Sequence, residues 1–502
     1  MVATANPFSS TKEKLIEHKK GNYTQSITLI IIMVGVTMAA IDTTVVVLAL
    51  PTIDLSLKTN PIASIWTILA YILILTVISS QVGKIGDRYG RVKLYNYGLI
   101  IFVIGSAMAG ISPNIAFLIF ARAFQAIGGA LLGTMSSAVI SDHFEPHERG
   151  KAFGYTGIGW NFGAILGIFI GGFLATVDWR LIFYINVPIG LVIIPIALYK
   201  LHDISKPKEE PIDILGASLL GVGLLLLVLG STFSMYEGIT YKELLMFFVS
   251  AVIISMYLLR ERKIKYPTIN FELFKNRVFN FSVAAATLQS TASYAILFII
   301  ILYLQGIRGL NPFVSSLYLL PGYLIGGLIA PVMGRVSDKV GARLPATLGL
   351  IFIATGYAMY IMFLGVDTPL YYIALITVLT GIGSGAFFPS NSSAIMANAP
   401  KERYAMASGL NRMLNNIGMV LSFAIALTVA SASVPRNTAM AIFSGSNIKL
   451  SAAEGASFLH GIDSAFMAAI IIILIAAVLS AVRGKENRMQ ITKDNASKEF
   501  SK

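Results

Sequence analysis

Apolar stretches of about 20 residues recur along almost the whole of this 502-residue chain, and they constrain its fold more than any other feature. A helix of that length crosses the hydrocarbon core of a bilayer, which is about 30 Å thick. Counting the stretches between polar breaks gives fourteen. A soluble protein would need a water-facing side on each helix, and these runs are apolar all round. The sequence therefore predicts an all-α polytopic membrane protein with fourteen transmembrane helices.

The Lys and Arg residues are distributed unevenly over the segments between these spans. Of the 38, 30 fall in the two tails and every second loop, six fall in the other loops, and Arg122 and Arg412 lie inside spans. Because Lys and Arg accumulate in cytoplasmic loops, this pattern places both termini in the cytoplasm and the chain in the cell membrane. The net charge of +13 is scattered over short loops, so we expect no nucleic-acid partner.

The chain carries no set of residues suited to catalysis. It has no cysteine, and its five histidines lie in termini or loops. A receptor would need a soluble signalling domain, whereas the longest hydrophilic segments reach only about 20–30 residues. We therefore expect no enzyme activity, no metal and no cofactor. The expected partners are the lipid bilayer, a small-molecule substrate and protons.

Two short segments half a chain apart resemble each other. Pro146–Ala152 follows the fourth span, and Pro400–Met406 follows the twelfth. A charged loop at residues 83–93 has a weaker copy at residues 334–343. Repeated halves are typical of transporters, whose substrate site lies where the halves meet. The expected division is a cytoplasmic tail (1–26), a six-helix bundle (27–201), two inserted spans (202–278), a second six-helix bundle (279–483) and a cytoplasmic tail (484–502).

The charged loop at residues 83–93 combines five ionisable residues with glycines that permit tight turns. A turn with so many charges cannot lie in hydrocarbon, so it belongs on the cytoplasmic face. Its spacing, Gly-x-x-x-Asp-Arg-x-Gly-Arg, resembles the loop signature of the major facilitator superfamily. The candidate gating residues are Gly83, Asp87, Arg88, Gly90 and Arg91.

Three further segments resemble the fourteen-span drug–proton antiporter family of that superfamily. Asp42–Pro51 is similar to its first-span signature, Arg122–Ala130 to its fourth-span motif and Trp179–Gly190 to the entry of its sixth span. The resemblance implies a major facilitator fold of two six-helix bundles plus two inserted spans, active as a monomer. It also implies proton-coupled export of amphipathic small molecules or drugs by alternating access, with the proton gradient as energy source.

The fifth span departs from the antiporter pattern. The family motif ends in Gly-Pro-x-x-Gly-Gly, whereas Gly167–Gly172 lacks the proline. This departure keeps a second hypothesis open. The chain could be a proton-coupled transporter, working in the uptake direction, of a specific metabolite, lipid or siderophore.

Asp42 and Arg122 are ionisable residues inside apolar spans, where a charge costs several kcal/mol unless it faces a partner or a wet cavity. With the outer end of the first span placed at residue 52, Asp42 lies about 14 Å below the outer surface and Arg122 about 10 Å below it. The resemblance places both spans at the cavity. We predict that Asp42 carries the transported proton and that Arg122 sets its pKa. The alternative is a purely structural role for each residue.

The thirteenth span contains a polar cluster around Arg412, about 12 Å from the cytoplasmic face. Asn411 and Asn415 share one helix face, as do Arg412 and Asn416. This cluster could line the cavity or simply join helices, a role that Asn often has in membranes. No acid lies in the ninth to thirteenth spans, which favours anionic, neutral or monocationic substrates over dications. The predicted cavity residues are Asn161, Gln289, Tyr294, Arg412 and Asn415.

Glycines recur every four residues in the fifth and tenth spans, and such ridges let helices approach closely. We predict that these two spans pack against each other where the halves meet, at a seam that opens during transport. The seam residues are Gly159, Gly163, Gly167, Gly171, Gly322 and Gly326.

Asp87 is the residue of the charged loop that we expect to hold one state of the transport cycle. It would meet Arg91 and the N-terminal end of a helix in the other half, because the helix dipole favours an anion there. The alternative is that the basic residues of the loop only anchor it at the cytoplasmic face.

Overall fold

The computed structural model describes residues 7–144, 149–204, 211–264, 267–269, 271–400, 404–433 and 452–484. Most of the predicted C-terminal tail and residues 146–148 and 401–403 of the two repeated segments lie outside these residues. Fourteen of the described helices are long and apolar enough to cross a membrane. The predicted fold class and number of spans are therefore confirmed.

In chain order the helices are α1 (Pro7–Leu57), α2 (Pro61–Tyr89), α3 (Arg91–Gly110), α4 (Ile115–His143), α5 (Arg149–Val177), α6 (Leu181–Tyr184), α7 (Asn186–Lys200), α8 (Ile214–Glu237), α9 (Tyr241–Glu261), η1 (Leu273–Lys275), α10 (Arg277–Leu302), the π-helical η2 (Tyr303–Ile307), α11 (Pro312–Val340), α12 (Arg343–Phe363), α13 (Leu370–Ala397), α14 (Tyr404–Ser433) and α16 (Ala452–Val482). Together α6 and α7 form one span, as do α10 and η2.

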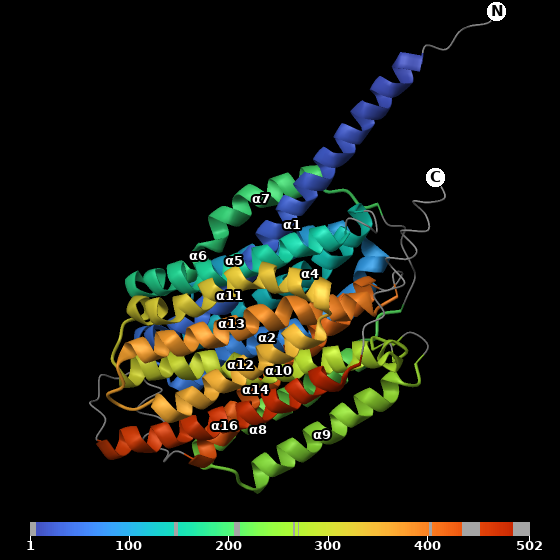
Figure 1. The fold of residues 1–502 in the computed structure, drawn as a ribbon. Helices are drawn as coiled ribbons and strands as arrows, with labels where there is room; N and C mark the ends of the chain where they lie inside the picture. The colour runs from blue at the N-terminus through green and yellow to red at the C-terminus, as the bar shows by residue number, and fades with distance from the viewer. Residues whose placement is uncertain are drawn as a thin grey trace, which may run out of the picture.

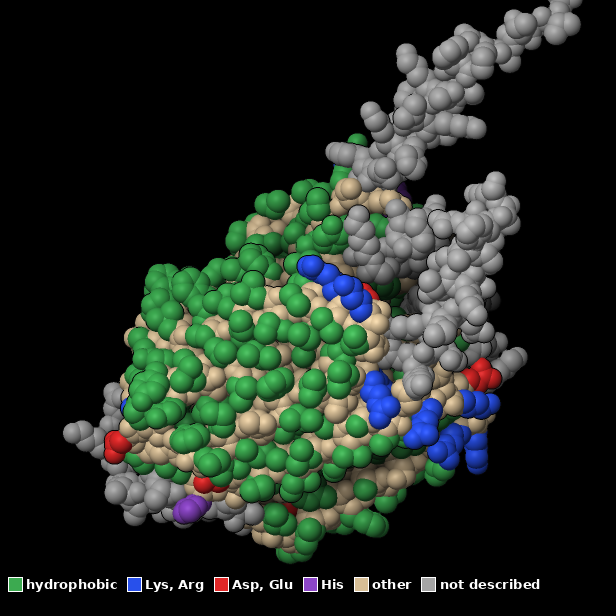
Figure 2. All heavy atoms as spheres, viewed as in Figure 1, with side chains coloured by type: hydrophobic (Ala, Val, Ile, Leu, Met, Phe, Trp, Pro, Cys, Tyr) green, Lys and Arg blue, Asp and Glu red, His purple; other side chains and the backbone are tan. Residues whose placement is uncertain are grey.

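The flank of the molecule is apolar and its ends carry the charges. Large side chains such as Leu191 and Leu328 are 67% and 71% exposed, as expected for a surface that faces lipid tails instead of water. Figure 2 shows this hydrophobic flank, with Lys and Arg gathered toward one end. We call this end the basic face; it includes Arg88, Arg260 and Arg343, which lie at ends of α2, α9 and α12.

Asparagine residues cap the N-terminal ends of several helices. Asn60 accepts a hydrogen bond from the Ala63 amide at 2.8 Å, and Asn114 accepts one from the Phe117 amide at 2.9 Å. Asn276 and Asn311 cap α10 and α11 in the same way. A cap of this kind satisfies an amide that has no partner within the helix. The short polar breaks of the sequence therefore both end one span and start the next.

The two halves of the chain repeat the same helix pairings (Figure 1). In the first bundle, α1 packs on α5, α2 packs on α4, and α3 packs on both α4 and α7. In the second bundle, α10 packs on α14, α11 packs on α13, and α12 packs on both α13 and α16. Each of these helices of the first bundle thus has a counterpart nine labels later with corresponding neighbours. The loop similarity in the sequence corresponds to a repeat of three-dimensional packing.

Two lateral seams join the bundles, one between α5 and α11 and one between α2 and α14. The inserted helices α8 and α9 form a hairpin, and α8 packs on both α2 and α14. The hairpin therefore covers the second of these seams, and Figure 1 shows α9 outside α8 at the edge of the molecule. Near the basic face, the Asp213 amide donates to the Gln81 side chain at 3.0 Å, which fixes the start of α8 to α2.

Candidate functional site

Asp42 lies near the middle of the membrane-spanning part of α1, Gln25–Leu57. The helix does not end near Pro51 but continues to Leu57, because Ile53 and Asp54 are buried and the Ser64 hydroxyl of α2 donates to the Asp54 carboxylate. Asp42 therefore lies about 22 Å from the Leu57 end of α1, at 1.5 Å per residue. The predicted end of this span near Pro51, from which the distance of about 14 Å was counted, was wrong.

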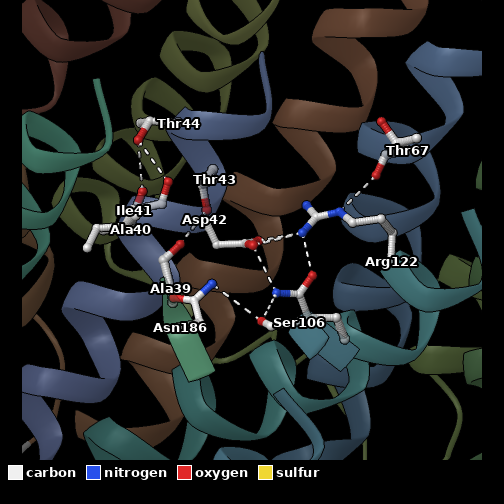
Figure 3. A network of polar contacts seen from close by, with 11 residues as sticks. Ala39, Ala40, Ile41, Asp42, Thr43, Thr44, Thr67, Ser106, Arg122 and Asn186 are labelled. Carbon is white, nitrogen blue, oxygen red and sulfur yellow. Dashed lines mark hydrogen bonds and ion pairs between the residues drawn. The ribbon is translucent and has the colours of Figure 1, made fainter. Parts of the chain in front are cut away.

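Asp42 is the polar residue of this turn of α1 that needs a hydrogen-bond partner from another helix. The Thr43 hydroxyl donates to the Ala39 carbonyl at 2.7 Å, and the Thr44 hydroxyl donates to the Ala40 carbonyl at 3.1 Å (Figure 3). Both threonines are thus satisfied within α1. The Asp42 carboxylate has no such possibility in its own helix, because an ionised carboxylate only accepts hydrogen bonds.

Arg122 of α4 supplies that partner. Its Nη1 lies 2.9 Å and 2.7 Å from the two carboxylate oxygens of Asp42, and its Nε donates to the Thr67 carbonyl of α2 at 3.2 Å. Asp42 and Arg122 are 0% and 1% exposed. The structure therefore brings together the two charged residues that the sequence singled out, in a buried ion pair that connects three helices (Figure 3).

A second polar layer surrounds the pair. The Gln125 side chain accepts from Arg122 and donates to Asp42 at 2.9 Å and to the Ser106 hydroxyl at 2.7 Å. Asn186, the first residue of α7, donates to the same hydroxyl at 3.3 Å. The network thus reaches from α1 through α4 and α3 to α7. The sequence analysis did not name Gln125 or Asn186 as site residues. Both lie in the family motifs that begin at Arg122 and Trp179, and this position was the sequence signal that could have identified them.

Tyr71 of α2 is a further site residue that the sequence did not indicate. The Arg122 guanidinium lies 4.2 Å from the centre of its ring and 5.6 Å from that of Phe183. Cation–π contacts of this kind stabilise a guanidinium removed from water. Its hydroxyl lies against Gly129 of α4, one turn from Gly133, and the Arg412 guanidinium of the second bundle lies against Gly133. Tyr71 is therefore close to both the ion pair and the second bundle. An aromatic residue in an apolar run gives no sequence signal for such a position.

The arrangement can couple a proton to a change of structure. While Asp42 is ionised, the pair is neutral overall and held by charge-assisted hydrogen bonds. Protonation of Asp42 would leave the buried Arg122 without its counter-ion, which costs several kcal/mol unless another partner is found. Gln125 already accepts from Arg122 and could hold it during that change. One proton therefore alters the balance of forces among α1, α2 and α4.

The predicted cavity residues lie in different surroundings. Arg412 of α14 lies where the bundles meet, because its guanidinium lies against Gly133 of α4. Tyr294 of α10 is half-buried against the core. The other three are an exposed Asn161 on α5, a half-buried Asn415 on α14, and a buried Gln289 on α10 that donates to Ser293 at 3.1 Å.

The charged loop is shorter than predicted, because α2 runs on to Tyr89 and only Gly90 separates it from α3. Gly83 is therefore a helical residue and not part of a turn. Gly90 does adopt a left-handed φ of 104°. The Asp203 carboxylate lies against it and accepts from the Val92 and Lys93 amides at 2.7 Å and 3.1 Å, which caps α3.

Asp87 has its described partner within the first bundle. It accepts from Arg91 Nε at 2.8 Å, and Arg91 Nη1 lies 2.5 Å from Asp142 of α4. The predicted contact with Arg91 is thus present. The predicted contact with the N-terminal end of a helix in the second bundle stays a prediction, and residues 401–403, which precede α14, lie outside the described residues. Arg88 is directed differently, with its guanidinium 5.4 Å from the Tyr89 ring centre.

The glycine ridges were assigned to the wrong interface. Cβ atoms at Gly163, Gly167 and Gly171 would collide with α1, one at Gly159 would contact it tightly, and those at Gly322 and Gly326 would meet α13. These six glycines therefore serve close packing within one bundle. The spans α5 and α11 do contact each other, but through other residues: a Cβ at Gly172 would meet Ser316, and Phe313 lies 6.1 Å from Phe169, measured between ring centres.

Comparison with known proteins identifies the family. The sequence profile of the Major Facilitator Superfamily matches residues 32–423, most of the chain. The riboflavin transporter RibZ of Clostridioides difficile (strain 630) is 32% identical over 405 residues, covering 79% of this chain and 86% of the relative. The multidrug resistance protein Stp of Mycobacterium tuberculosis (strain CDC 1551 / Oshkosh) is 29% identical over 419 residues, covering 82% and 77%.

A solved structure shares the fold. The inward-facing, unoccupied crystal structure of a bacterial homologue of the human lysosomal transporter Spinster superposes with a TM-score of 0.65 at 16% identity, covering 92% of this chain and 97% of that one. The chain belongs to the Major Facilitator Superfamily. It is a membrane-embedded secondary transporter of small molecules and not an enzyme.

Proposed function

We propose that the chain is a proton-coupled antiporter that exports amphipathic small molecules, including drugs, by alternating access. The observation that carries this proposal is the fully buried Asp42–Arg122 ion pair with Gln125 bound to both members. An ionisable pair in the membrane interior marks a proton or substrate pathway. Relatives named as multidrug resistance proteins support export as the direction.

In the proposed cycle, Asp42 accepts a proton when the site faces the outside and releases it toward the cytoplasm. The change of charge at Asp42 forces Arg122 to exchange partners, and the bundles rock about the substrate between them. The basic face is then the cytoplasmic one, with both termini on that side, in the cell membrane. A single chain contains both bundles and so acts as a monomer.

A second candidate is proton-coupled transport of one specific metabolite, with uptake as its direction. Two observations favour it: the fifth span lacks the proline of the antiporter motif, and the 32%-identical relative is named a riboflavin transporter. The same ion pair would serve this function. The two candidates differ in cargo and direction and share the coupling chemistry.

Reconstitution into liposomes with an imposed ΔpH tests these alternatives. Cationic, neutral and anionic amphiphiles, together with riboflavin, would be offered on either side of the membrane. Movement of many unrelated compounds against the proton flow supports drug export. Movement of a single compound class together with protons favours the metabolite transporter, and an absence of any ΔpH-dependent movement contradicts both.

A further inference from the structure

Arg412 is a cation between the bundles that has no partner for its charge. Among the described residues, none forms a hydrogen bond or ion pair with its guanidinium, and the neutral phenol of Tyr71 lies about one turn of α4 away, against Gly129. Arg122 presents the opposite case, since it has Asp42, Gln125 and Thr67 as acceptors. A cation inside the membrane that lacks an anion is destabilising. Such a residue persists where a ligand supplies the missing charge.

The Arg412 side chain points into the membrane interior and not toward the basic face. The Arg412 backbone lies about 12 Å from the basic end of α14. Gly133, which the guanidinium touches, lies about 15 Å from the basic end of α4. The Tyr71 hydroxyl lies against Gly129, one turn further along α4 from its basic end. A side chain that only sought water would extend to the nearer surface instead.

The surface of α14 that carries Arg412 faces the first bundle. The Ser408 hydroxyl, one turn before Arg412, lies 3.2 Å from the Ser137 hydroxyl of α4. Gly133 lies one turn from Ser137 on the same side of α4, and the absence of a Cβ there makes room for the guanidinium. Arg412 and its neighbour Asn415 are only half-buried at this position between the bundles. Part of the surface of these two residues therefore remains accessible to a molecule that enters between the bundles.

Amide side chains with unused hydrogen-bonding atoms accompany this cation. Asn411 and Asn415 each have a buried Oδ1 without a partner, Asn416 has such an Nδ2, and Gln289 of α10 has such an Oε1. A buried polar atom left unpaired costs about 1–3 kcal/mol. Four of them on the two packed helices α10 and α14 indicate a surface built to bind something polar. Tyr294 of α10 and Tyr323 of α11 are partly buried and can provide aromatic faces.

We propose that Arg412 and the amides beside it form the substrate subsite of the second bundle, and that this subsite selects organic monoanions carrying a ring system. The inference rests on the proposed transport function and specifies its cargo. A carboxylate or sulfonate would accept two parallel hydrogen bonds from the Arg412 guanidinium. The amides would bind polar atoms of the substrate, and the tyrosines would stack on its ring. The subsite lies three turns along α4 from the Asp42–Arg122 pair, which carries no net charge to repel the anion.

Binding to purified protein without any gradient tests this subsite. The probes are 2-naphthoate, its neutral amide 2-naphthamide and the cation 2-naphthylmethylammonium, measured by equilibrium dialysis. We expect 2-naphthoate to bind at least about tenfold more tightly than the other two, since a charge-assisted hydrogen bond contributes on that order. In Arg412→Gln the advantage of the anion disappears. The exposed Arg343→Gln loses the same charge and keeps that advantage.

Two further variants separate binding from folding. Gly133→Ala places a methyl group where the guanidinium lies, so it weakens anion binding while the charge of Arg412 is retained. Arg412→Gln removes an unpaired cation, so its thermal midpoint in detergent is at least as high as that of the parent protein. A clearly lower midpoint would show that Arg412 has a structural role and would overturn the proposal.

The subsite is also overturned if 2-naphthoate does not bind, if the amide or the cation binds as tightly, or if Arg412→Gln leaves the preference unchanged. The two proposals fail separately. A protein that binds the anion yet moves nothing under a ΔpH contradicts the proposed transport function and keeps the subsite. A protein that moves only cations under a ΔpH keeps the function and loses the subsite.

Discussion

A double-mutant cycle measures the coupling free energy between Asp42 and Arg122. Asp42→Asn leaves Arg122 buried without its counter-ion, and removal of one member of a buried pair typically costs 3–5 kcal/mol. Because Thr67 and Gln125 still accept from Arg122, we expect the lower end, about 3 kcal/mol. Arg122→Gln leaves the Asp42 carboxylate buried without its counter-ion, so it should lower the free energy of unfolding by a similar amount.

The double variant contains no uncompensated charge and loses only hydrogen bonds and packing, so it too costs about 3 kcal/mol. The two single changes together predict about 6 kcal/mol, and the difference is a coupling energy of about 3 kcal/mol. Unfolding of the purified protein in mixed micelles, with increasing SDS content, measures each free energy. The exposed pair Asp178–Arg180, 3.9 Å apart, is the matched control and should couple by less than about 1 kcal/mol.

A coupling energy below about 1 kcal/mol for Asp42 and Arg122 would refute the reasoning. Protonation of Asp42 could not then force Arg122 to change partners, because breaking the pair would cost too little. The proposed link between the proton and the rocking of the bundles would have no energetic basis.

Three further substitutions test how the helices are held. Gly163→Ala should lower the unfolding free energy by about 1–3 kcal/mol because its Cβ would lie 2.6 Å from the Thr37 carbonyl oxygen. The control Gly157→Ala, whose Cβ would have no atom within 4 Å, should not lower it. Equal effects of the two substitutions would contradict the packing of the α5 glycines on α1. Gly90→Ala should destabilise by about 1–3 kcal/mol through its left-handed φ, and a thermal shift matching that of helical Gly83→Ala would contradict this. Asp87→Asn should reduce transport at normal membrane insertion, and unchanged transport would leave the loop with an anchoring role only.

The sequence was sufficient for the fold because hydropathy and loop charge act over long stretches. Each of the fourteen spans is an apolar run that must form a helix in lipid, where every backbone amide needs a partner within its own segment. Span ends were less predictable. The first span passes through Pro51 and continues to Leu57, since Ile53 and Asp54 find buried positions beside α2.

The candidate site was predictable only at the ionisable residues that lie within apolar spans. Asp42 and Arg122 stand out because a charge in an apolar run is costly unless it has a partner. Tyr71 does not stand out, because an aromatic residue fits any apolar run. The glycine ridges identify helices that pack closely, but the spacing of four does not say which neighbour they face, and here it is α1 and α13.

Proton movement in liposomes tests the central claim most directly. Purified protein would be reconstituted with a pH-sensitive dye trapped inside, and a gradient of a transported compound would be imposed without any initial ΔpH. Coupled antiport predicts that the compound moves down its gradient while protons move the opposite way, and that Asp42→Asn abolishes the proton signal. Movement of the compound with no proton signal, or an undiminished signal in Asp42→Asn, would contradict the account.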